Sequence, residues 1–403
     1  MSNCLQKYPM TIVCIAFMLG IVAVGEWFPA FPWAGWTCLL AASAGAAIVA
    51  RSHPSWQTIF LLSALFALGG MRMVVSDTSS ATSEFNPTSN PLRRAIVQRM
   101  NSLFAEAGAQ QEGSIVVAMS MGEKRDISRD LRADYSSSGA AHVLALSGLH
   151  IGIIFFLFKL LFSHRHRYRL TVRQLLAEGL LIAAVWCYVY IVQMPPSAVR
   201  AATMVTLYEL MGLHQRGHVS LNVLGATAFA MLLIRPADLY DIGFQLSFAA
   251  VTAIVVLYPM FSQLVPRPTN RVLLWIWSML GVSLAAQIGV APLIAYHFGY
   301  ISTYSVFSSL VVIPCATIIV MMSVFLIVFL YVTIVAETIA ALLASVANIM
   351  NRFVMWMASL PGSTINDIHL NVGQVVFIYL TIGCLSLLLA LMLKKNKMMD
   401  KTS

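Results

Sequence analysis

Hydrophobic residues are grouped along this chain in long blocks, and polar residues gather in the short stretches between them. A helix needs about 20 predominantly apolar residues to cross a bilayer. Blocks of about this length recur from residue 9 onward, so we predict an all-α polytopic membrane protein with about 12 transmembrane helices (10–13). The predicted spans are residues 9–25, 33–50, 57–75, 141–162, 174–193, 197–213, 219–234, 243–261, 272–295, 304–331, 334–350 and 372–393.

Two of these regions carry residues that disturb a helix. Asn348, Asn351 and Arg352 interrupt the apolar pattern across residues 334–360, which makes this the weakest predicted span. Gly289 with Pro292, and Pro314 farther on, indicate broken or kinked helices. Such breaks are tolerated at membrane depth only where protein or water partners the freed backbone groups.

The composition agrees with a membrane protein and excludes soluble, collagenous and disordered classes. Hydrophobic residues make up 59% of the 403 positions and charged residues only 10%, with a mean hydropathy of +0.81. Soluble domains carry about 25% charged residues. So few charges are too few to cover a soluble globule of this size.

The net charge of +9 follows from topology. Cations gather in the loop 164–173 and in the tail 394–403, and such clusters mark the cytoplasmic side. Both termini are therefore predicted to be cytoplasmic. On this topology the cytoplasmic face carries +12 and the opposite face −3, so the positive-inside rule accounts for the whole excess.

We divide the chain into four parts. A three-span membrane segment (1–75) precedes an extracytoplasmic segment (76–140), a membrane core (141–393) and a basic cytoplasmic tail (394–403).

The extracytoplasmic segment begins with a Ser/Thr-rich linker, residues 76–88. A helix follows, with Asn90 as N-cap, Pro91 in the first helical position and Gly108 beyond its end. Its apolar face lies either in the outer interface of the bilayer or against neighbouring loops. A second short helix is predicted over residues 128–135.

The first polar stretch within a predicted span contains His142, Ser147, Gly148, His150 and Gly152. His150 is expected about nine residues, or roughly 13 Å, into the span, close to the bilayer midplane. A polar ring at that depth faces a bundle interior, a cavity or a partner. Ser147 and Gly148 permit close helix approach or a local break.

An interhelical hydrogen bond with small-residue packing, a metal site and a Ser-His hydrolase are all compatible with the stretch. No converging set of acids, cysteines and histidines accompanies it, so no metal or cofactor is predicted.

Two further polar stretches lie at the starts of later spans. Asp241 precedes a span that carries Gln245 and Ser247 in its first turns, and its charge suits the positive end of a helix. Arg200 lies one turn inside the helix that Ser197 is expected to start after a double proline. It either snorkels outward or pairs with an acid or a polyanion.

At these three stretches the sequence resembles the ComEC-type competence proteins, the inner-membrane channel family for transforming DNA. The family signature is similar to residues 141–152, and it is preceded by elements similar to residues 119–123, 131–132 and 138–139. Later signatures resemble residues 200–204 and 241–248, and the likeness continues from His297 to Pro314. It covers about half of the chain, residues 116–315, in the family's order and spacing.

The chain departs from this family in three ways. Family members commonly carry an OB-fold domain before the signature, where residues 76–115 here read as linker plus helix. Many end in a metallo-β-lactamase-like domain, but no His-x-His-x-Asp cluster is present, so we expect no nuclease activity from this chain. Residues 307–310 replace a usual asparagine. The resemblance therefore implies a short form of the family.

The leading hypothesis is a channel core for single-stranded DNA uptake in the bacterial inner membrane. It is expected to be a multi-pass protein with no enzymatic activity and no cofactor. A separate DNA receptor and a cytoplasmic motor or nuclease are expected as partners, and the chain itself as a possible homo-oligomer. The candidate path residues are His142, Ser147, Gly148, His150, Gly152, Arg200, Asp241, Gln245 and Ser247.

Two alternatives of other classes remain. A secondary transporter or flippase for a small or lipid-linked anion fits the spans and Arg200. A non-conducting membrane scaffold fits the absence of the family's accessory domains.

Overall fold

The structure, a computed structural model, describes residues 8–28, 31–79, 90–162, 172–214, 220–265 and 267–399. Three predicted features therefore lie wholly or partly outside the described residues. They are the Ser/Thr-rich linker beyond residue 79, the basic loop through residue 171 and the end of the tail at residues 400–403.

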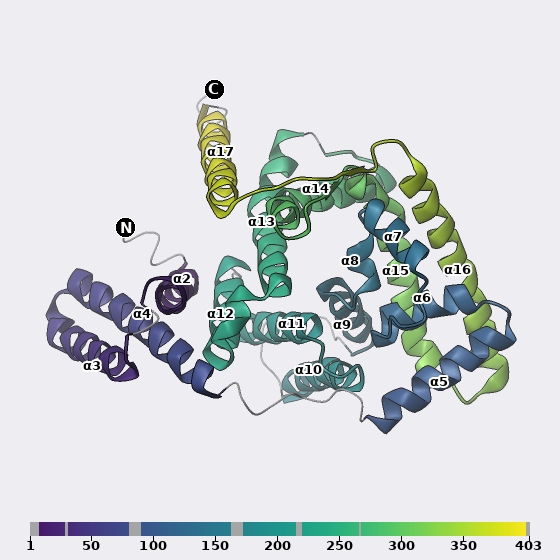
Figure 1. Cartoon of the computed structure of the whole chain (residues 1–403), viewed down its shortest axis with the longest axis horizontal. Helices are drawn as coiled ribbons and strands as arrows, with labels where there is room; N and C mark the ends of the chain where they lie inside the picture. Colours follow the sequence, from purple (N-terminus) through teal and green to yellow (C-terminus); the bar gives the residue numbers. More distant parts are fainter. Residues whose placement is uncertain are drawn as a thin grey trace. The chain divides into compact units, whose positions relative to one another are not determined.

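Helices form nearly all of the secondary structure in these ranges (Figure 1). The π-helix η1 (Ala23–Trp27) and the 3-10 helices η2 (Ala50–Ser52) and η4 (Pro236–Tyr240) are short, and β1 (Ile301–Ser302) pairs antiparallel with β2 (Thr364–Ile365). The α-helices are α2 (Pro9–Val22), α3 (Trp33–Val49), α4 (Pro54–Ser79), α5 (Pro91–Glu106), α6 (Gln110–Met121), α7 (Arg129–Ser137), α8 (Ala141–Leu144), α9 (Gly148–Phe162), α10 (Val172–Ile191), α11 (Pro196–His214), α12 (Ser220–Ile234), α13 (Ile242–Leu264), α14 (Arg271–Phe298), α15 (Ser305–Val328), α16 (Thr333–Ser359) and α17 (Val372–Met399).

These helices confirm the prediction of an all-α polytopic membrane protein. In the described ranges, eight helices are long and apolar enough to cross a membrane, and three shorter apolar helices accompany them. Each of the twelve predicted spans coincides with a helix, and the span predicted at 141–162 is divided into α8 and α9.

The chain separates into two compact units, and each is built from two stretches of sequence. The first unit comprises Met1–Pro87 and Thr203–Gln245, and the second comprises Thr88–Ala202 and Leu246–Ser403. The division into four consecutive domains remains a prediction.

In the first unit α2 packs against both α4 and α12, and α3 packs against α4 (Figure 1). Glycines allow the closest of these contacts. A Cβ atom at Gly20 or Gly69 would overlap a backbone carbonyl of the facing helix, at Phe66 and Phe17 respectively. Thr11 Oγ1 also donates to the Leu221 carbonyl oxygen over 2.9 Å. Close packing of this kind is how helices associate in an apolar medium, where water exclusion does not drive them together.

We expect Gly20→Ala to lower the free energy of unfolding by about 1–3 kcal/mol, because the added methyl group forces α2 and α4 apart. Gly45→Ala is the matched control, since a Cβ atom there has no neighbour within 4 Å. The measurement is the thermal unfolding midpoint in detergent. Equal midpoints for the two variants would contradict this packing.

The second unit has α6 at its centre. Residues 113–121 of this helix are all buried, and α6 packs against α5, α15 and α16. The interpretation of residues 76–115 as linker plus helix is therefore wrong, because α6 begins at Gln110. Its apolar run is too short for a span and is buried by its neighbours on every side, so it showed neither a span nor an amphipathic pattern.

Helix α5 confirms the predicted end signals. The Asn90 side chain accepts hydrogen bonds from the backbone N–H groups of Leu92 and Arg93, Pro91 is the first helical residue, and Gly108 has a φ of +67°. The apolar face packs within the protein, since α5 contacts α6 and α16. The buried residues of that face are Ile96, Met100, Leu103 and Phe104.

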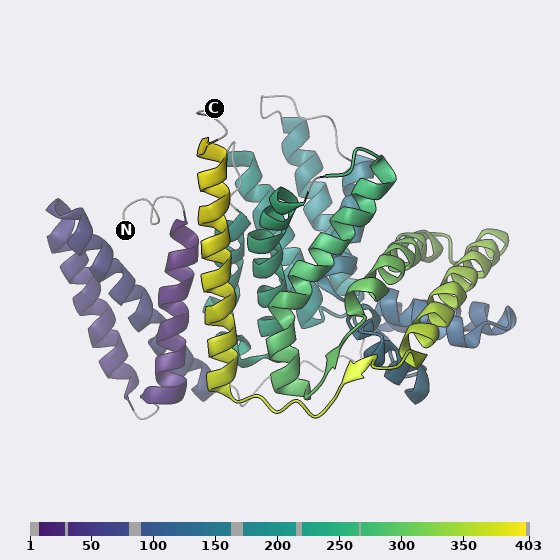
Figure 2. The same ribbon diagram turned by 90° about the horizontal axis from the view of Figure 1, so that it is seen from above.

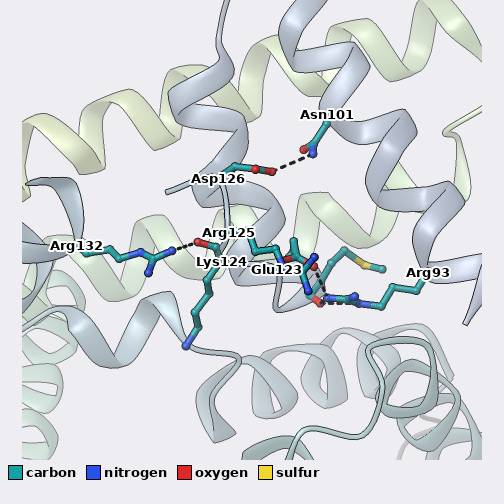
Figure 3. Close-up of polar contacts among 8 residues, drawn as sticks. Arg93, Asn101, Glu123, Lys124, Arg125, Asp126 and Arg132 are labelled. Atoms are coloured by element: carbon teal, nitrogen blue, oxygen red, sulfur yellow. Dashed lines mark hydrogen bonds and ion pairs between the residues drawn. The ribbon is translucent and has the colours of Figure 1, made fainter. Parts of the chain in front are cut away.

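Polar contacts hold the loop between α6 and α7 against α5 (Figure 3). Arg93 Nη2 donates to the Met121 carbonyl oxygen over 3.1 Å and lies 3.3 Å from Glu123 Oε2. Asn101 Nδ2 donates to Asp126 Oδ2 over 3.3 Å. The last carbonyl groups of a helix have no N–H donor within that helix. Arg93 supplies a donor for one of them at the end of α6.

Helix α16 runs unbroken through the region predicted to be weakest. Asn348 and Asn351 bond to the helices that precede the core, and Arg352 is exposed. Asn348 Nδ2 donates to Glu112 Oε1 over 3.1 Å, and Tyr135 Oη donates to Asn351 Oδ1 over 2.7 Å. Burial, and then the neighbouring Cys315, raise the pKa of Tyr135, so its hydroxyl stays protonated as a donor.

Helices α14 and α15 also continue through Pro292 and Pro314, so the predicted breaks do not occur there. Gly289 has a different use. A Cβ atom at this position would lie 2.5 Å from the Ala253 Cβ atom, so the glycine lets α13 and α14 approach closely. Its carbonyl oxygen accepts a hydrogen bond of 2.7 Å from Tyr379 Oη in α17.

A tight turn at Gly139 joins α7 to α8 and packs against the start of α15. Gly139 has a φ of +79°, and a Cβ atom there would overlap Ser305. Ser302 in β1 donates to the Ser137 carbonyl oxygen over 2.9 Å, which fixes the strand pair seen in Figure 2 against this turn.

Gly139→Ala is expected to destabilise the protein more than Gly108→Ala does. Both glycines have a positive φ, but a Cβ atom at Gly108 has no neighbour within 4 Å. The difference therefore isolates the steric overlap with Ser305, for which we expect about 1–3 kcal/mol. Unfolding midpoints in detergent measure it, and indistinguishable variants would show that α15 does not pack on this turn.

Candidate functional site

The candidate site is a break between α8 and α9. Helix α8 ends at Leu144, Ala145 takes an extended conformation (φ −89°, ψ 142°), and α9 begins at Gly148. The prediction of one continuous span over residues 141–162 is therefore wrong, and the local break that Ser147 and Gly148 permit is present. The break forms because side chains partner the backbone groups that it exposes.

The His150 side chain partners the backbone N–H of Ser147, the residue that precedes α9. Ser147 N–H donates to His150 Nδ1 over 2.9 Å, and Ser147 Oγ lies 3.1 Å from the same nitrogen. This is one half of a capping box, in which the side chain three residues later, usually glutamate or glutamine, accepts from the N-cap N–H; the Ser147 hydroxyl contacts the ring. Because Nδ1 accepts the backbone N–H, the ring proton of the neutral imidazole is on Nε2.

His150 is fully buried, with 0% of its surface exposed. It is the third residue of α9 and lies only about 3 Å along the helix axis from the first, while its depth in the bilayer stays a prediction. The ring therefore lies at a helix N-terminus rather than in mid-helix.

The start of α11 lies beside this break. Gln193 and Met194, with φ values of 69° and 51°, turn the chain out of α10. Ser197 Oγ then donates to the Leu146 carbonyl oxygen, which the break leaves outside both helices. A Cβ atom at Gly148 would lie 3.5 Å from the Ala201 Cβ atom, so the first turns of α9 and α11 are in contact distance.

Arg200 is next to this contact, in the second turn of α11. Only 5% of its surface is exposed. An arginine that snorkels keeps its guanidinium in water. The buried position contradicts the snorkelling interpretation and places a cation inside the second unit.

His142 and Gly152 lie on either side of the break. His142 is exposed in α8, and its Nδ1 lies 3.0 Å from the Gly139 carbonyl oxygen, to which it donates. Gly152 is half-buried in α9, and a Cβ atom there has no neighbour within 4 Å.

Asp241 and Gln245 belong to the first unit. Asp241 Oδ1 accepts a hydrogen bond of 2.7 Å from Phe244 N–H, so the predicted capping of α13 is confirmed. Gln245 Nε2 donates to the Leu239 carbonyl oxygen over 3.1 Å and thereby ties α13 to η4. Ser247 lies half-buried farther along α13, in the second unit.

The structure thus brings Ser147, Gly148 and His150 together and places Arg200 one residue from their neighbour Ala201. Sequence reasoning missed the support behind them. Tyr188 Oη in α10 donates over 2.5 Å to the carbonyl oxygen of Ser120, a buried residue of α6. A lone tyrosine in an apolar helix carries no signal of such a distant acceptor.

We expect Ser197→Ala to lower the free energy of unfolding by about 1–3 kcal/mol, because it leaves the Leu146 carbonyl oxygen unsatisfied. Ser278→Ala is the control, since among the residues that the structure describes that hydroxyl bonds only to Leu274 of its own helix. Unfolding in detergent measures both variants. A loss no greater than that of the control would contradict the role of Ser197 as a tether.

The region that contains the candidate site is similar to known proteins. Residues 119–392 match the model of a family described as "Competence protein". The match begins in α6 and continues into α17, so it includes every candidate residue.

Three curated relatives share about half of the chain. "ComE operon protein 3" of Bacillus subtilis (strain 168) is 31% identical over 227 residues, which are 56% of this chain and 27% of the relative. An uncharacterised protein of Aquifex aeolicus (strain VF5) is 32% identical over 203 residues, 50% of this chain and 44% of its own. The uncharacterised protein YcaI of Escherichia coli (strain K12) is 26% identical over 210 residues, 51% of this chain and 27% of its own.

The chain therefore spans less than half the length of each of these relatives. No solved structure matches it.

Proposed function

Because this chain belongs to the competence protein family, we propose that it forms the membrane core through which single-stranded DNA enters a bacterial cell during natural transformation. The family match covers more than half of the chain and all of the candidate site. One relative is named for a ComE operon. We further propose the inner membrane as its location, as a multi-pass protein.

The observation that carries the proposal is the capped break between α8 and α9. Polar backbone and side-chain groups inside an apolar helical unit are costly, and in membrane proteins they mark the path of a polar substrate. Here the break, a buried histidine and the buried Arg200 occur together in one unit.

In this proposal each candidate residue has a positional role. Gly148 and Gly152 keep one face of α9 free of side chains. Ser147 and His150 hold the break open, and Arg200 supplies a cation for backbone phosphate. His142 and Ser247 are further path candidates of the second unit, and Asp241 and Gln245 remain separate candidates of the first unit.

The chain acts without catalysis or cofactor in this proposal, and partners supply the rest. A separate receptor delivers DNA to the outer face, whose net charge gives no attraction for a polyanion. A cytoplasmic motor draws the strand inward, and a nuclease degrades the complementary strand that does not enter. The lipid bilayer surrounds the core.

A clean deletion in a naturally competent host tests the proposal. We expect transformation by added DNA to fall to the background without DNA and to return with the complementing gene. Electroporation of the same DNA is the control, because it bypasses uptake and reports recombination alone. Undiminished natural transformation in the deletion strain would overturn the proposal.

A further inference from the structure

The loop that joins α6 to α7 is strongly charged and begins beside the break between α8 and α9. Residues 122–132, which are this loop and the first turn of α7, include four cations and three acids. Gly122 opens the loop with a φ of +73°, and a Cβ atom there would lie 4.0 Å from the Leu146 Cβ atom. Leu146 is part of the break, so the charged loop starts where the proposed path for DNA lies.

Two of the acids in this loop already have partners. Glu123 lies 3.3 Å from Arg93 and 3.5 Å from Arg125, and so is shared by two cations. Asp126 accepts a hydrogen bond of 3.3 Å from the Asn101 amide, on the side of the loop that faces α5 (Figure 3). Both carboxylates are thus used to hold the loop.

Lys124 and Arg132 are two neighbouring cations with no such partner. Both are exposed, and among the described residues neither forms an ion pair. The Arg132 guanidinium donates to the Lys124 carbonyl oxygen, which keeps the two residues together (Figure 3). Partial loss of water, and then the charge of Arg132, lower the pKa of Lys124. Two like charges held in this way repel each other, and an anion bound to both would remove that cost.

The backbone that presents these two cations is fixed. Ile127 and Leu131, at 4% and 2% exposure, anchor the end of the loop and the start of α7 in the interior of the second unit. The Met121 carbonyl oxygen at the other end of the loop accepts from Arg93. Binding to a loop that is already ordered avoids the entropy cost of ordering it.

We infer that Lys124 and Arg132 form a binding site for backbone phosphate groups of single-stranded DNA, next to the break between α8 and α9. The inference rests on the proposed function for the identity of the ligand. Lysine and arginine bind phosphate oxygens without reading the base sequence, as a path for any strand requires.

The surroundings of the loop favour DNA over a lipid headgroup as the occupant. The loop begins at Gly122 beside the break, which is the proposed path of the strand. Its supporting helices α5, α6 and α7 are not among the described helices that are long and apolar enough to cross a membrane. The two cations are thus presented by the part of the second unit that has no spanning helix of its own.

Such a site acts at contact distance. The face on which we predict it carries a net charge of −3, so the protein as a whole does not attract a polyanion from afar. At an ionic strength of 0.1 M, charges act over about 10 Å. Lys124 and Arg132 can therefore hold a strand that a receptor has already delivered.

The test compares two adjacent residues of the loop. Lys124→Gln removes an unpaired cation and keeps the backbone carbonyl to which Arg132 bonds. Arg125→Gln is the matched control, because it removes the same charge from an exposed residue that is paired with Glu123. The full chain in nanodiscs of phosphatidylcholine is titrated with a fluorescent oligothymidylate at salt concentrations between about 50 and 200 mM.

For a single strand, each phosphate contact contributes about 0.7 to the slope of log K against the logarithm of the salt concentration. We expect Lys124→Gln to lower this slope by about 0.7 and to weaken binding several-fold at the lowest salt, while Arg125→Gln leaves the slope unchanged. Lys124→Arg, which keeps the charge, is expected to restore the wild-type slope. Equal slopes for Lys124→Gln and Arg125→Gln, at equal unfolding midpoints, would refute the site, as would a wild type that does not bind the oligomer.

Arg132→Gln gives a second reading if Lys124→Gln does not fold. The glutamine amide can still donate to the Lys124 carbonyl, so this variant also removes mainly a charge. The same loss of about 0.7 in slope is expected, and an unchanged slope would count against the site.

Two further arms identify the occupant. The same oligomer with uncharged methylphosphonate linkages is expected to bind the wild type and the variants weakly and equally. Phosphatidylglycerol is then added to the nanodiscs. If Lys124→Gln reduces retention of this lipid and leaves the oligomer slope unchanged, a lipid headgroup is the occupant and the inference is wrong.

Failure of the proposed function is distinguishable from failure of this site. It appears as normal transformation in the deletion strain, whatever the titrations give.

Discussion

A polar backbone group inside an apolar unit must find its partner within the protein, and this constraint organises the second unit. Uninterrupted helices meet it by themselves, but the break between α8 and α9 does not. Ser197 from α11 partners the Leu146 carbonyl, and His150 partners the Ser147 amide. The break therefore determines where α11 begins and which side chain occupies the start of α9. Even the neighbouring helix α10 is tied in, through Tyr188 and the carbonyl of Ser120.

How much of this was predictable depends on the distance over which each signal acts. The caps at Asn90 and Asp241 were predicted because the capping side chain and the amide that it bonds are within three residues. The helices that coincide with the predicted spans followed from apolar length. Helix α6 was missed, and the break was foreseen only as a possibility, because both depend on partners far along the chain. Ser197 and Leu146 are 51 residues apart, and no local pattern records such a pair.

The residues that looked disruptive in the sequence turn out to be the ones that join helices. Asn348 and Asn351 connect α16 to α6 and α7, and Gly289 brings α13 and α14 together. In a hydropathy pattern, a polar or small residue only makes its own helix a less convincing span. In a membrane bundle, hydrogen bonds and small residues are instead the main specific contacts between helices. At the start of α9 a neutral histidine stands where a glutamate is usual, and it avoids the cost of burying a charge.

The interleaving of the two units sets the order in which the protein can be built. Thr11 in α2 bonds to Leu221 in α12, 210 residues later. At a synthesis rate of about 5–20 residues per second, roughly 10–40 s separate the emergence of these two helices from the ribosome. During that interval α2, α3 and α4 occupy the bilayer with the α12-binding surface of α2 facing lipid or the insertion machinery. The first unit is therefore completed only after the helices of the intervening segment have been inserted.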